Sequence, residues 1–233
     1  MGEVGLKVKL LRYTPTPEEI VAMSAKLCYS SADIDELELG IEAKDQSRFI
    51  EKLMDMNHLS PVEHASFTFG IEGVSRSLLA QITRHRIASF SVKSQRYVSE
   101  KSREGETFNY IVPPSIKDLG QEYVDKYNAQ MMQIQGWYNE WLDILGDKGE
   151  KSNQDARFVL PNSVETKIIM TMNARELLHF FNLRCCNRAQ WEIRRLAMEM
   201  LRQVKNVAPN IFRNAGPGCL RGKCPEGKMT CGK

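Results

Sequence analysis

Two hydrophobic periodicities along one chain restrict its fold more than any other feature of the sequence. Phe67, Phe69 and Ile71 alternate with small or polar residues, which is the two-residue repeat of a half-buried strand. Residues 118–145 instead repeat apolar side chains every three or four positions, as a long amphipathic helix does. Strand patterns also cover residues 7–13 and 164–172, without a regular strand–helix–strand rhythm. The sequence therefore predicts a single α+β domain with a mostly antiparallel sheet.

Helix starts are marked by capping residues followed by proline or glutamate. Thr16 precedes Pro17, Ser60 precedes Pro61 and Glu63, and Asn173 stands three residues before Glu176. Further helices are expected over residues 49–57, 75–84, 153–160, 173–186 and 189–207. On the 118–145 helix, the spacing predicts that Leu119, Tyr123, Tyr127, Met131, Ile134, Trp141 and Leu145 face the core.

The charge of the 233-residue chain is concentrated at its C-terminal end. The net charge of +3 equals that of residues 216–233, so residues 1–215 are neutral overall. A neutral body lacks the basic surface of a nucleic-acid-binding protein. The composition predicts a neutral folded body over 1–215 and a flexible, basic, Gly- and Cys-rich tail over 216–233. No apolar run reaches the roughly 18 residues of a membrane span, and no signal-peptide pattern is present, which predicts a cytoplasmic protein without membrane contact.

Six cysteines in a chain of this length do not predict a disulfide framework. Cys219, Cys224 and Cys231 resemble a metal-binding spacing, but a structural zinc site needs four ligands, so no metal site is predicted. Cys185 and Cys186 are expected to be packing residues rather than nucleophiles.

Residues 84–97 combine arginines and hydroxyls where a helix gives way to an irregular segment. Arg84, Arg86 and Arg96 offer guanidinium groups, and Ser94 is one of three serines between them. Guanidinium groups bind phosphate oxygens in a bidentate manner, so the segment suits a phosphate ligand. A solvated basic loop is the alternative that three basic residues alone would favour.

The 173–186 helix places a cation on its apolar face. Arg184 shares that face with Leu177, Phe180 and Phe181. A buried guanidinium needs an anion or acceptor, so Arg184 either pairs with a structural carboxylate or lines a ligand pocket. Arg175 and His179 form a second polar stripe, whose alternative is a solvated helix face.

The segment from His58 to Glu63 also has two interpretations. A helix N-terminus after His58 could bind an anion, while ordinary capping explains Ser60 and Glu63 without any ligand.

Taken together, these motifs resemble the flavin-dependent thymidylate synthase family. Arg84, His85 and Arg86 are followed by Ser94 and Arg96. The other matching residues occur in the same order as in the family: His58, Ser60, Glu63 and His64, then Gln81, then Arg157 and Pro161, then Asn173, Arg175, His179, Asn182 and Arg184, then Gln190 to Glu192. The resemblance extends over about residues 44–213.

The resemblance implies synthesis of dTMP from dUMP, with 5,10-methylenetetrahydrofolate as carbon donor, FAD as hydride carrier and NADPH as reductant. It assigns FAD to His58, Ser60, Glu63, Arg84, His85, Arg86, Asn173, Arg175 and His179. It assigns dUMP to Gln81, Arg84, Ser94, Gln95, Arg96, Arg157 and Arg184. Within that set Arg184 is implied to be catalytic, because a cation beside the uracil would favour ionisation at N3. The resemblance also implies a homotetramer in which several subunits build each site.

Two departures from the family pattern concern the signature segment. Val92 replaces a polar or acidic residue, and Gln95 stands where a small residue is common. Two other functions remain as alternatives: a nucleic-acid-binding module, and an FAD-dependent NADPH oxidase of the same fold.

Overall fold

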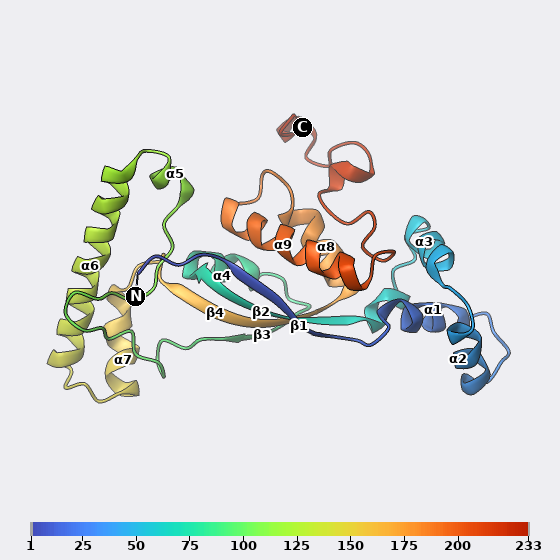
Figure 1. Cartoon of the computed structure of the whole chain (residues 1–233), viewed down its shortest axis with the longest axis horizontal. Helices are drawn as coiled ribbons and strands as arrows, with labels where there is room; N and C mark the ends of the chain where they lie inside the picture. Colours follow the sequence, from blue (N-terminus) through green and yellow to red (C-terminus); the bar gives the residue numbers. More distant parts are fainter. Residues whose placement is uncertain (1, 233) are drawn as a thin grey trace. The chain divides into compact units, whose positions relative to one another are not determined.

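The computed structural model describes residues 2–232 and confirms the α+β class (Figure 1). Its sheet has the strand order β1-β2-β4-β3, with bounds Lys7–Tyr13 for β1, Ser66–Ser75 for β2, Ser89–Val92 for β3 and Glu165–Asn173 for β4. The Thr14 amide, just past the end of β1, donates to the Ser66 carbonyl at the start of β2 at 3.0 Å. Side chains of Thr68 and Thr171, near the start of β2 and the end of β4, are 2.9 Å apart. Both pairs are antiparallel, as predicted.

The α-helices are α1 (Pro17–Leu27), α2 (Ile34–Glu42), α3 (Ser47–Asp55), α4 (Arg76–Ile82), α5 (Pro114–Lys117), α6 (Gln121–Ile144), α7 (Glu150–Ala156), α8 (Ala174–Arg184) and α9 (Trp191–Val207). Short 3₁₀ turns are η1 (Pro61–His64), η2 (Arg157–Val159), η3 (Gly218–Arg221) and η4 (Gly227–Met229). Among residues 2–232, none of these helices combines the length and the apolar content that a membrane crossing needs.

The chain divides into two compact units. The first comprises residues 1–7, 71–83 and 91–168, and so contains α4 to α7. The second comprises residues 8–70, 84–90 and 169–233, and contains α1 to α3, α8, α9 and the tail. β2 and β4 each contribute residues to both units.

Aromatic side chains form part of the core of the second unit. Phe67 of β2 and Phe181 of α8 both contact the ring of Phe212, with centroids 5.4 and 6.0 Å apart. Phe180 lies beside Phe181, and all four side chains are fully buried. The predicted cap of α8 is present, because the Asn173 side chain accepts a hydrogen bond from the Glu176 amide at 2.9 Å. The cap and the aromatic face together fix where the polar face of α8 points.

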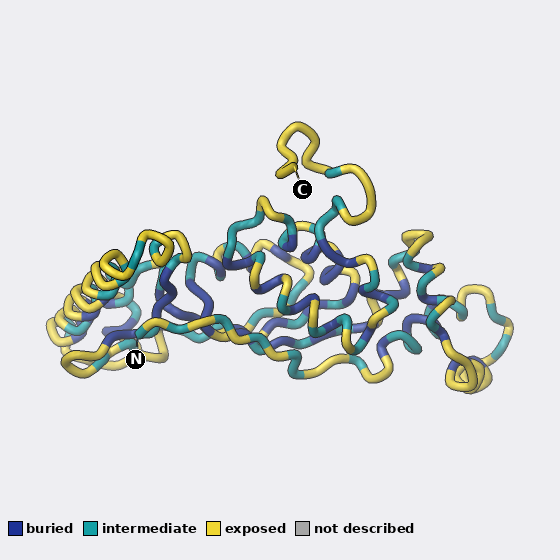
Figure 2. Tube along the Cα trace, turned by 45° about the horizontal axis from the view of Figure 1, so that its top comes forward, coloured by how far each residue is buried: buried dark blue, intermediate teal, exposed yellow. Residues whose placement is uncertain are grey.

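The long helix α6 packs in the first unit through a stripe that partly matches the predicted one. As predicted, Met131 is buried, and Tyr127, Ile134 and Leu145 pack against core residues. Gln135, Tyr138 and Leu142 are buried as well, whereas Tyr123 and Trp141 are 44% and 47% exposed. Much of the helix surface is exposed (Figure 2). Gln135 is buried because its amide accepts from the Phe108 N–H at 2.6 Å and donates to the Glu100 carbonyl at 3.0 Å. Because Gln135 is polar, apolar periodicity alone does not predict its burial.

Two predicted caps and one predicted loop are wrong. Thr16 and Ser60 precede helical turns as expected, but neither side chain makes a capping hydrogen bond. Residues 89–92, expected to be irregular, form β3, and the adjoining Lys93 amide donates to the Lys167 carbonyl at 2.9 Å. Short-range signals could not show this pairing, because the partner is distant in the chain.

Candidate active site

Arg184, the last residue of α8, is held by a buried histidine in the second unit. Its Nε–H donates to Nε2 of His85 at 3.0 Å. On the other side of the ring, His85 Nδ1 lies 3.1 Å from Oε1 of Glu176, the third residue of α8. His85 is 5% exposed and Glu176 is 7% exposed. Within residues 2–232 no carboxylate pairs directly with Arg184, so its guanidinium is positioned by a ring rather than neutralised by an acid.

The geometry defines the tautomer of His85. A guanidinium only donates, so His85 Nε2 must accept and the ring proton must lie on Nδ1, donating to Glu176. Burial lowers the pKa of His85, the Glu176 hydrogen bond opposes this, and the Arg184 charge lowers the pKa further. His85 therefore stays neutral at pH 7 and orients Arg184.

We expect this histidine to make folding stability pH-dependent. Its folded pKa lies below the unfolded value of about 6.5, so the contribution is complete above that value and is lost as pH falls toward the folded pKa. The unfolding free energy of wild type should fall by up to about 1.4 kcal/mol per pH unit in this window from His85 alone. Urea titrations at pH 7.5 and 5.5 of wild type and His85→Gln should show a smaller decrease in the variant. The exposed His64, changed to Gln, is the control, and an equal decrease in H85Q and wild type would contradict this prediction.

A pocket of about 1030 Å³ opens beside α8 in the second unit. The exposed residues Arg175 and His179 line it, together with Asn173 and with Glu63 of η1. Glu63 forms an ion pair with Arg175. The pocket matches the upper end of small-molecule sites, which span roughly 300–1,000 Å³, so it is large enough for a dinucleotide. The second polar stripe of α8 thus faces a pocket rather than open solvent.

The remaining residues predicted to bind FAD are not among those that line this pocket. Arg84 and Arg86 are exposed on either side of buried His85. Burial, with the nearby charge of Arg84, lowers the pKa of Arg184. Ser60 is exposed and makes no cap, so the capping interpretation is wrong for it. His58 lines a second pocket of about 500 Å³ together with residues of α1 and α3.

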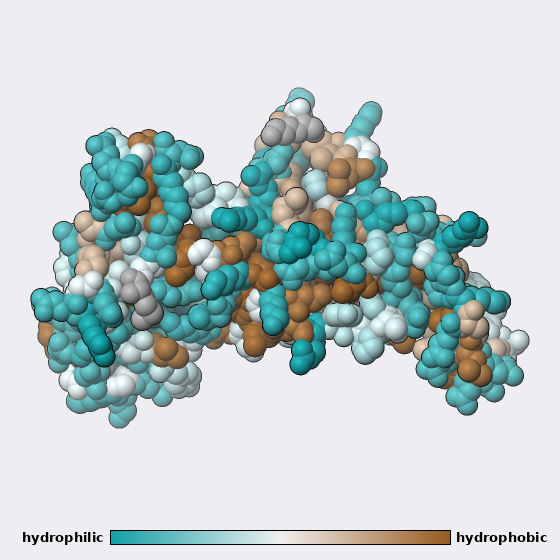
Figure 3. Space-filling model, viewed as in Figure 1, coloured by the Kyte–Doolittle hydropathy of each residue, from teal (hydrophilic) through white to brown (hydrophobic). Residues whose placement is uncertain are grey.

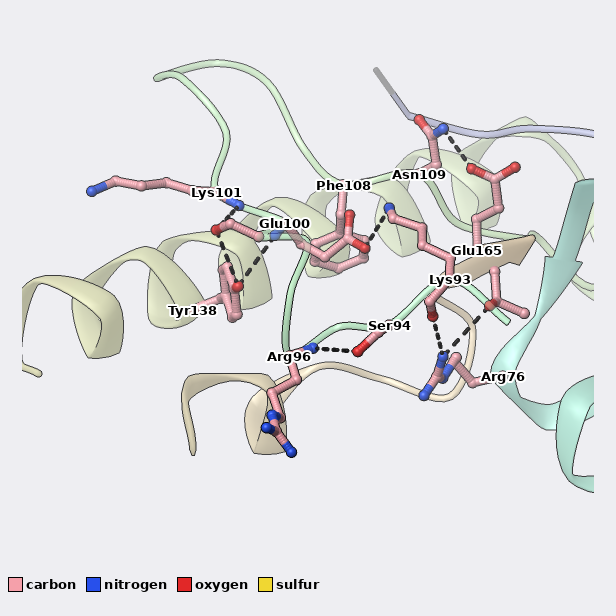
Figure 4. Close-up of polar contacts among 12 residues, drawn as sticks. Arg76, Lys93, Ser94, Arg96, Glu100, Lys101, Phe108, Asn109, Tyr138 and Glu165 are labelled. Atoms are coloured by element: carbon pink, nitrogen blue, oxygen red, sulfur yellow. Dashed lines mark hydrogen bonds and ion pairs between the residues drawn. The ribbon is translucent and has the colours of Figure 1, made fainter. Parts of the chain in front are cut away.

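Most residues predicted to bind a nucleotide belong to the first unit. Gln81 is on α4, Arg157 begins η2, and Ser94 to Arg96 follow β3 (Figure 4). Ser94 Oγ accepts from the Arg96 amide at 3.2 Å. Arg96 Nε donates to Glu150 at 2.6 Å, and this exposed carboxylate raises the pKa of Arg96. An exposed ion pair of this kind is weak, so the Arg96 guanidinium can exchange Glu150 for another anion.

Two orphaned polar atoms lie in the same region. Gln95 is 7% exposed, and its Nε2 has no hydrogen-bond partner among residues 2–232. Asn153 donates to the Arg96 carbonyl at 3.2 Å, while its buried Oδ1 has no partner in that part of the chain. Leaving a buried polar group without a hydrogen-bond partner costs free energy. The Gln95 Nε2 donor and the Asn153 Oδ1 acceptor are therefore suited to hydrogen bonds with a polar ligand.

Sequence reasoning missed Arg76 and Asn153. Arg76 NH1 donates to the Lys93 carbonyl at 3.3 Å, and burial together with the positive charge of Arg157 lowers the Arg76 pKa (Figure 4). Two neighbouring guanidinium groups repel each other and therefore favour an anion between or beside them. The position of Arg76 directly after a strand was a usable signal, whereas nothing in the sequence distinguished Asn153.

The cysteines take no part in these groups. Cys185 is buried, and burial raises its pKa to about 12, so it is not a thiolate nucleophile. Among residues 2–232, no cluster of three or more His, Cys, Asp or Glu side chains is arranged to hold a metal ion.

An α+β scaffold with a dinucleotide-sized pocket and a separate group of guanidinium and amide side chains defines a nucleotide-binding protein. More particularly, residues 9–210 match the family model described as thymidylate synthase complementing protein, and the chain belongs to this family.

Individual relatives agree with this assignment. The chain is 55% identical to a flavin-dependent thymidylate synthase of Geobacter sulfurreducens, over 98% of this chain and 94% of that protein. It is 49% identical to one of Clostridium tetani, over 99% and 94% of the two chains. A crystal structure of the Helicobacter pylori enzyme complexed with FAD and dUMP superposes with a TM-score of 0.67 at 26% identity, covering 90% of this chain and 99% of that one.

Proposed function

We propose that this chain makes dTMP from dUMP as a flavin-dependent thymidylate synthase, with 5,10-methylenetetrahydrofolate as carbon donor and NADPH as reductant. The observation that carries the proposal is the arrangement of Arg184, His85 and Glu176, which presents an uncompensated guanidinium at the end of α8. Family membership and the relatives named for this activity support it.

FAD fits the pocket beside α8. The pocket offers a guanidinium, an imidazole and an amide in Arg175, His179 and Asn173, and its volume of about 1030 Å³ suits a dinucleotide. When bound, FAD supplies the hydride chemistry, and the protein supplies position and electrostatics. We assign FAD to these three residues and to His58, Ser60, Glu63, Arg84, His85 and Arg86.

We assign dUMP to Gln81, Arg84, Ser94, Gln95, Arg96, Arg157 and Arg184. Guanidinium groups suit the phosphate, and the orphaned Gln95 amide gives a further donor. In this proposal Arg184 lies at the uracil, where a fixed cation stabilises negative charge that develops at N3 and so raises the nucleophilicity of C5. Neutral His85 keeps the guanidinium oriented without cancelling its charge.

The predicted FAD set belongs to the second unit, whereas five of the seven dUMP residues belong to the first. We propose that a homotetramer, in the cytoplasm, completes each site from several subunits. Exposed apolar side chains are available for self-association, among them Phe158, Trp137 and Ile144 of the first unit. Hydrophobic residues reach the molecular surface at several places in the view of Figure 3. The body over residues 1–215 is then the catalytic part, and residues 216–233 form its basic tail.

A dTMP-formation assay with single omissions tests the function. Product should require dUMP, methylenetetrahydrofolate, NADPH and FAD, and the purified protein should show a flavin absorbance band. NADPH oxidation that dUMP and the folate leave unchanged, without dTMP, would instead indicate an oxidase of this fold. Tight binding to nucleic acid that weakens steeply with salt, with no turnover, would indicate a nucleic-acid-binding module.

Arg157→Ala tests the nucleotide assignment in the first unit. A lost charge-assisted phosphate contact is worth about 1.5–3 kcal/mol, so KM for dUMP should rise roughly ten-fold or more while kcat changes little. FAD affinity should be unchanged. The exposed Arg103, changed to Ala, controls for loss of charge in the same unit. Equal KM values in R157A and R103A would remove Arg157 from the nucleotide site.

A further inference from the structure

The C-terminal tail contributes to the pocket beside α8. Leu220 and Arg221, both in η3, line it together with Asn182 and Asn214. Residues 216–233 lie beyond the segment 9–210 that matches the family model. The family model therefore does not cover the wall of the pocket that the tail forms, whereas the matches to individual relatives extend over most of the tail.

Contacts with neighbouring elements hold the tail in this position. Arg188, just after α8, forms an ion pair with Glu226 of the tail. A Cβ on Gly218 would meet Asn182 Oδ1 at 3.0 Å and Pro225 at 2.9 Å. Gly216 has φ +146°, a conformation that suits glycine, and a Cβ at this position would lie 2.6 Å from Cδ1 of Leu220. Tail residues are mostly exposed (Figure 2), yet η3 is packed against the α8 end.

Arg221 differs from the other charged groups of the pocket in its partners. The acidic groups that line the pocket already have cationic or imidazole partners: Glu63 with Arg175, Glu176 with His85 and Asp55 with Arg213. Arg221 bonds only to neutral acceptors, the Asn182 side-chain oxygen at 2.7 Å and the Asn214 carbonyl at 3.3 Å. Within residues 2–232 it has no carboxylate partner.

A guanidinium has five N–H donors in a fixed fork, so two neutral bonds leave donors for a ligand. Its uncompensated charge at the rim of a dinucleotide-sized pocket favours an anionic group there. The neutral bonds to Asn182 and Asn214 hold the side chain in place beforehand, which reduces the entropy lost on binding.

We propose that Arg221 of the tail binds a phosphate group of a dinucleotide in this pocket. The identity of the ligand rests on the proposed function: both FAD and NADPH carry phosphate groups of this chemistry. The tail thereby belongs to the binding site rather than being a free appendage.

Three variants separate a direct phosphate contact from a general effect of charge or of tail packing. Arg221→Gln removes the charge and keeps a polar side chain, Arg221→Lys keeps the charge, and Lys223→Gln removes an exposed charge two residues away that does not line the pocket. FAD affinity is measured by titrating the full-length apoprotein with FAD, and NADPH affinity from the anaerobic rate of flavin reduction. Both are repeated at low and high salt.

R221Q should weaken binding of one of the two dinucleotides about ten-fold, R221K should restore most of the loss, and K223Q should stay close to wild type. The difference between wild type and R221Q should shrink as salt rises. Equal affinities of R221Q and K223Q for both dinucleotides overturn the inference, and so does a loss in R221Q that R221K does not restore. Wild-type protein that binds neither dinucleotide would overturn the proposed function instead.

Discussion

Arg184→Ala is expected to lower kcat for dTMP formation by roughly 10²–10³-fold, the range seen when one group that stabilises developing charge is removed. The side chain is held in place by His85, whose ring is fixed by Glu176, so the guanidinium is preorganised for an anion. Truncation removes that cation and leaves His85 bonded to Glu176, so the protein should fold. FAD should still bind, because the predicted FAD residues are all retained.

The measurement combines turnover, FAD titration and circular dichroism on the same preparation. Arg202→Ala is the matched control in the second unit, because Arg202 is exposed on α9 and, among residues 2–232, its one ion-pair partner is its neighbour Glu199. Arg184→Lys keeps a charge but loses the planar fork, and should recover only part of the activity. Turnover in R184A close to that of R202A would contradict the catalytic role of Arg184.

Phe181→Ala is expected to lower the free energy of unfolding by about 3–5 kcal/mol, the range for truncating a buried phenylalanine. The ring is fully buried and contacts the rings of Phe180 and Phe212, with centroid distances of 5.8 and 6.0 Å. Its truncation would leave an apolar cavity. Because Phe181 lies one turn before Arg184 on α8, its loss should also loosen the end of the helix that carries the guanidinium.

Urea unfolding followed by circular dichroism measures this loss. Leu39→Ala is the control, since that side chain on α2 of the same unit is 66% exposed and its removal should change stability by less than about 0.5 kcal/mol. Similar unfolding free energies for F181A and L39A would show that Phe181 does not contribute to the core as its burial implies.

Much of the fold follows from local patterns in the chain. The alternation around Phe67 and the cap at Asn173 correctly placed β2 and α8, because a strand repeat and a side-chain cap act over a few residues. Ser60 carried the same kind of signal but makes no capping bond. The apolar repeat of α6 correctly placed Met131 in the core but did not predict the burial of Gln135, whose amide is satisfied by groups remote in the chain.

In the candidate site, too, some features follow from local sequence and others depend on tertiary packing. The placement of Arg184 on the apolar face of α8 follows from helical spacing, and with it the requirement for an acceptor. The identity of this acceptor does not follow from the sequence, because His85 lies 99 residues away from Arg184 and only tertiary packing brings the two together. Asn153 was missed for the same reason, because it became notable only through groups that folding brought near. Arg76 had a local signal in its position directly after a strand, but its contact with the Lys93 carbonyl also depends on folding.

The sequence by itself determined most of the element types, the order of the motifs and which side chains could bind anions, because these depend on residue chemistry and short-range spacing. Tertiary structure decided which of those groups meet. It set the neutral tautomer of His85 behind Arg184, and it divided the predicted residues between two compact units. It also placed Arg221 of the tail at the pocket, since contacts between distant residues depend on how the whole chain packs.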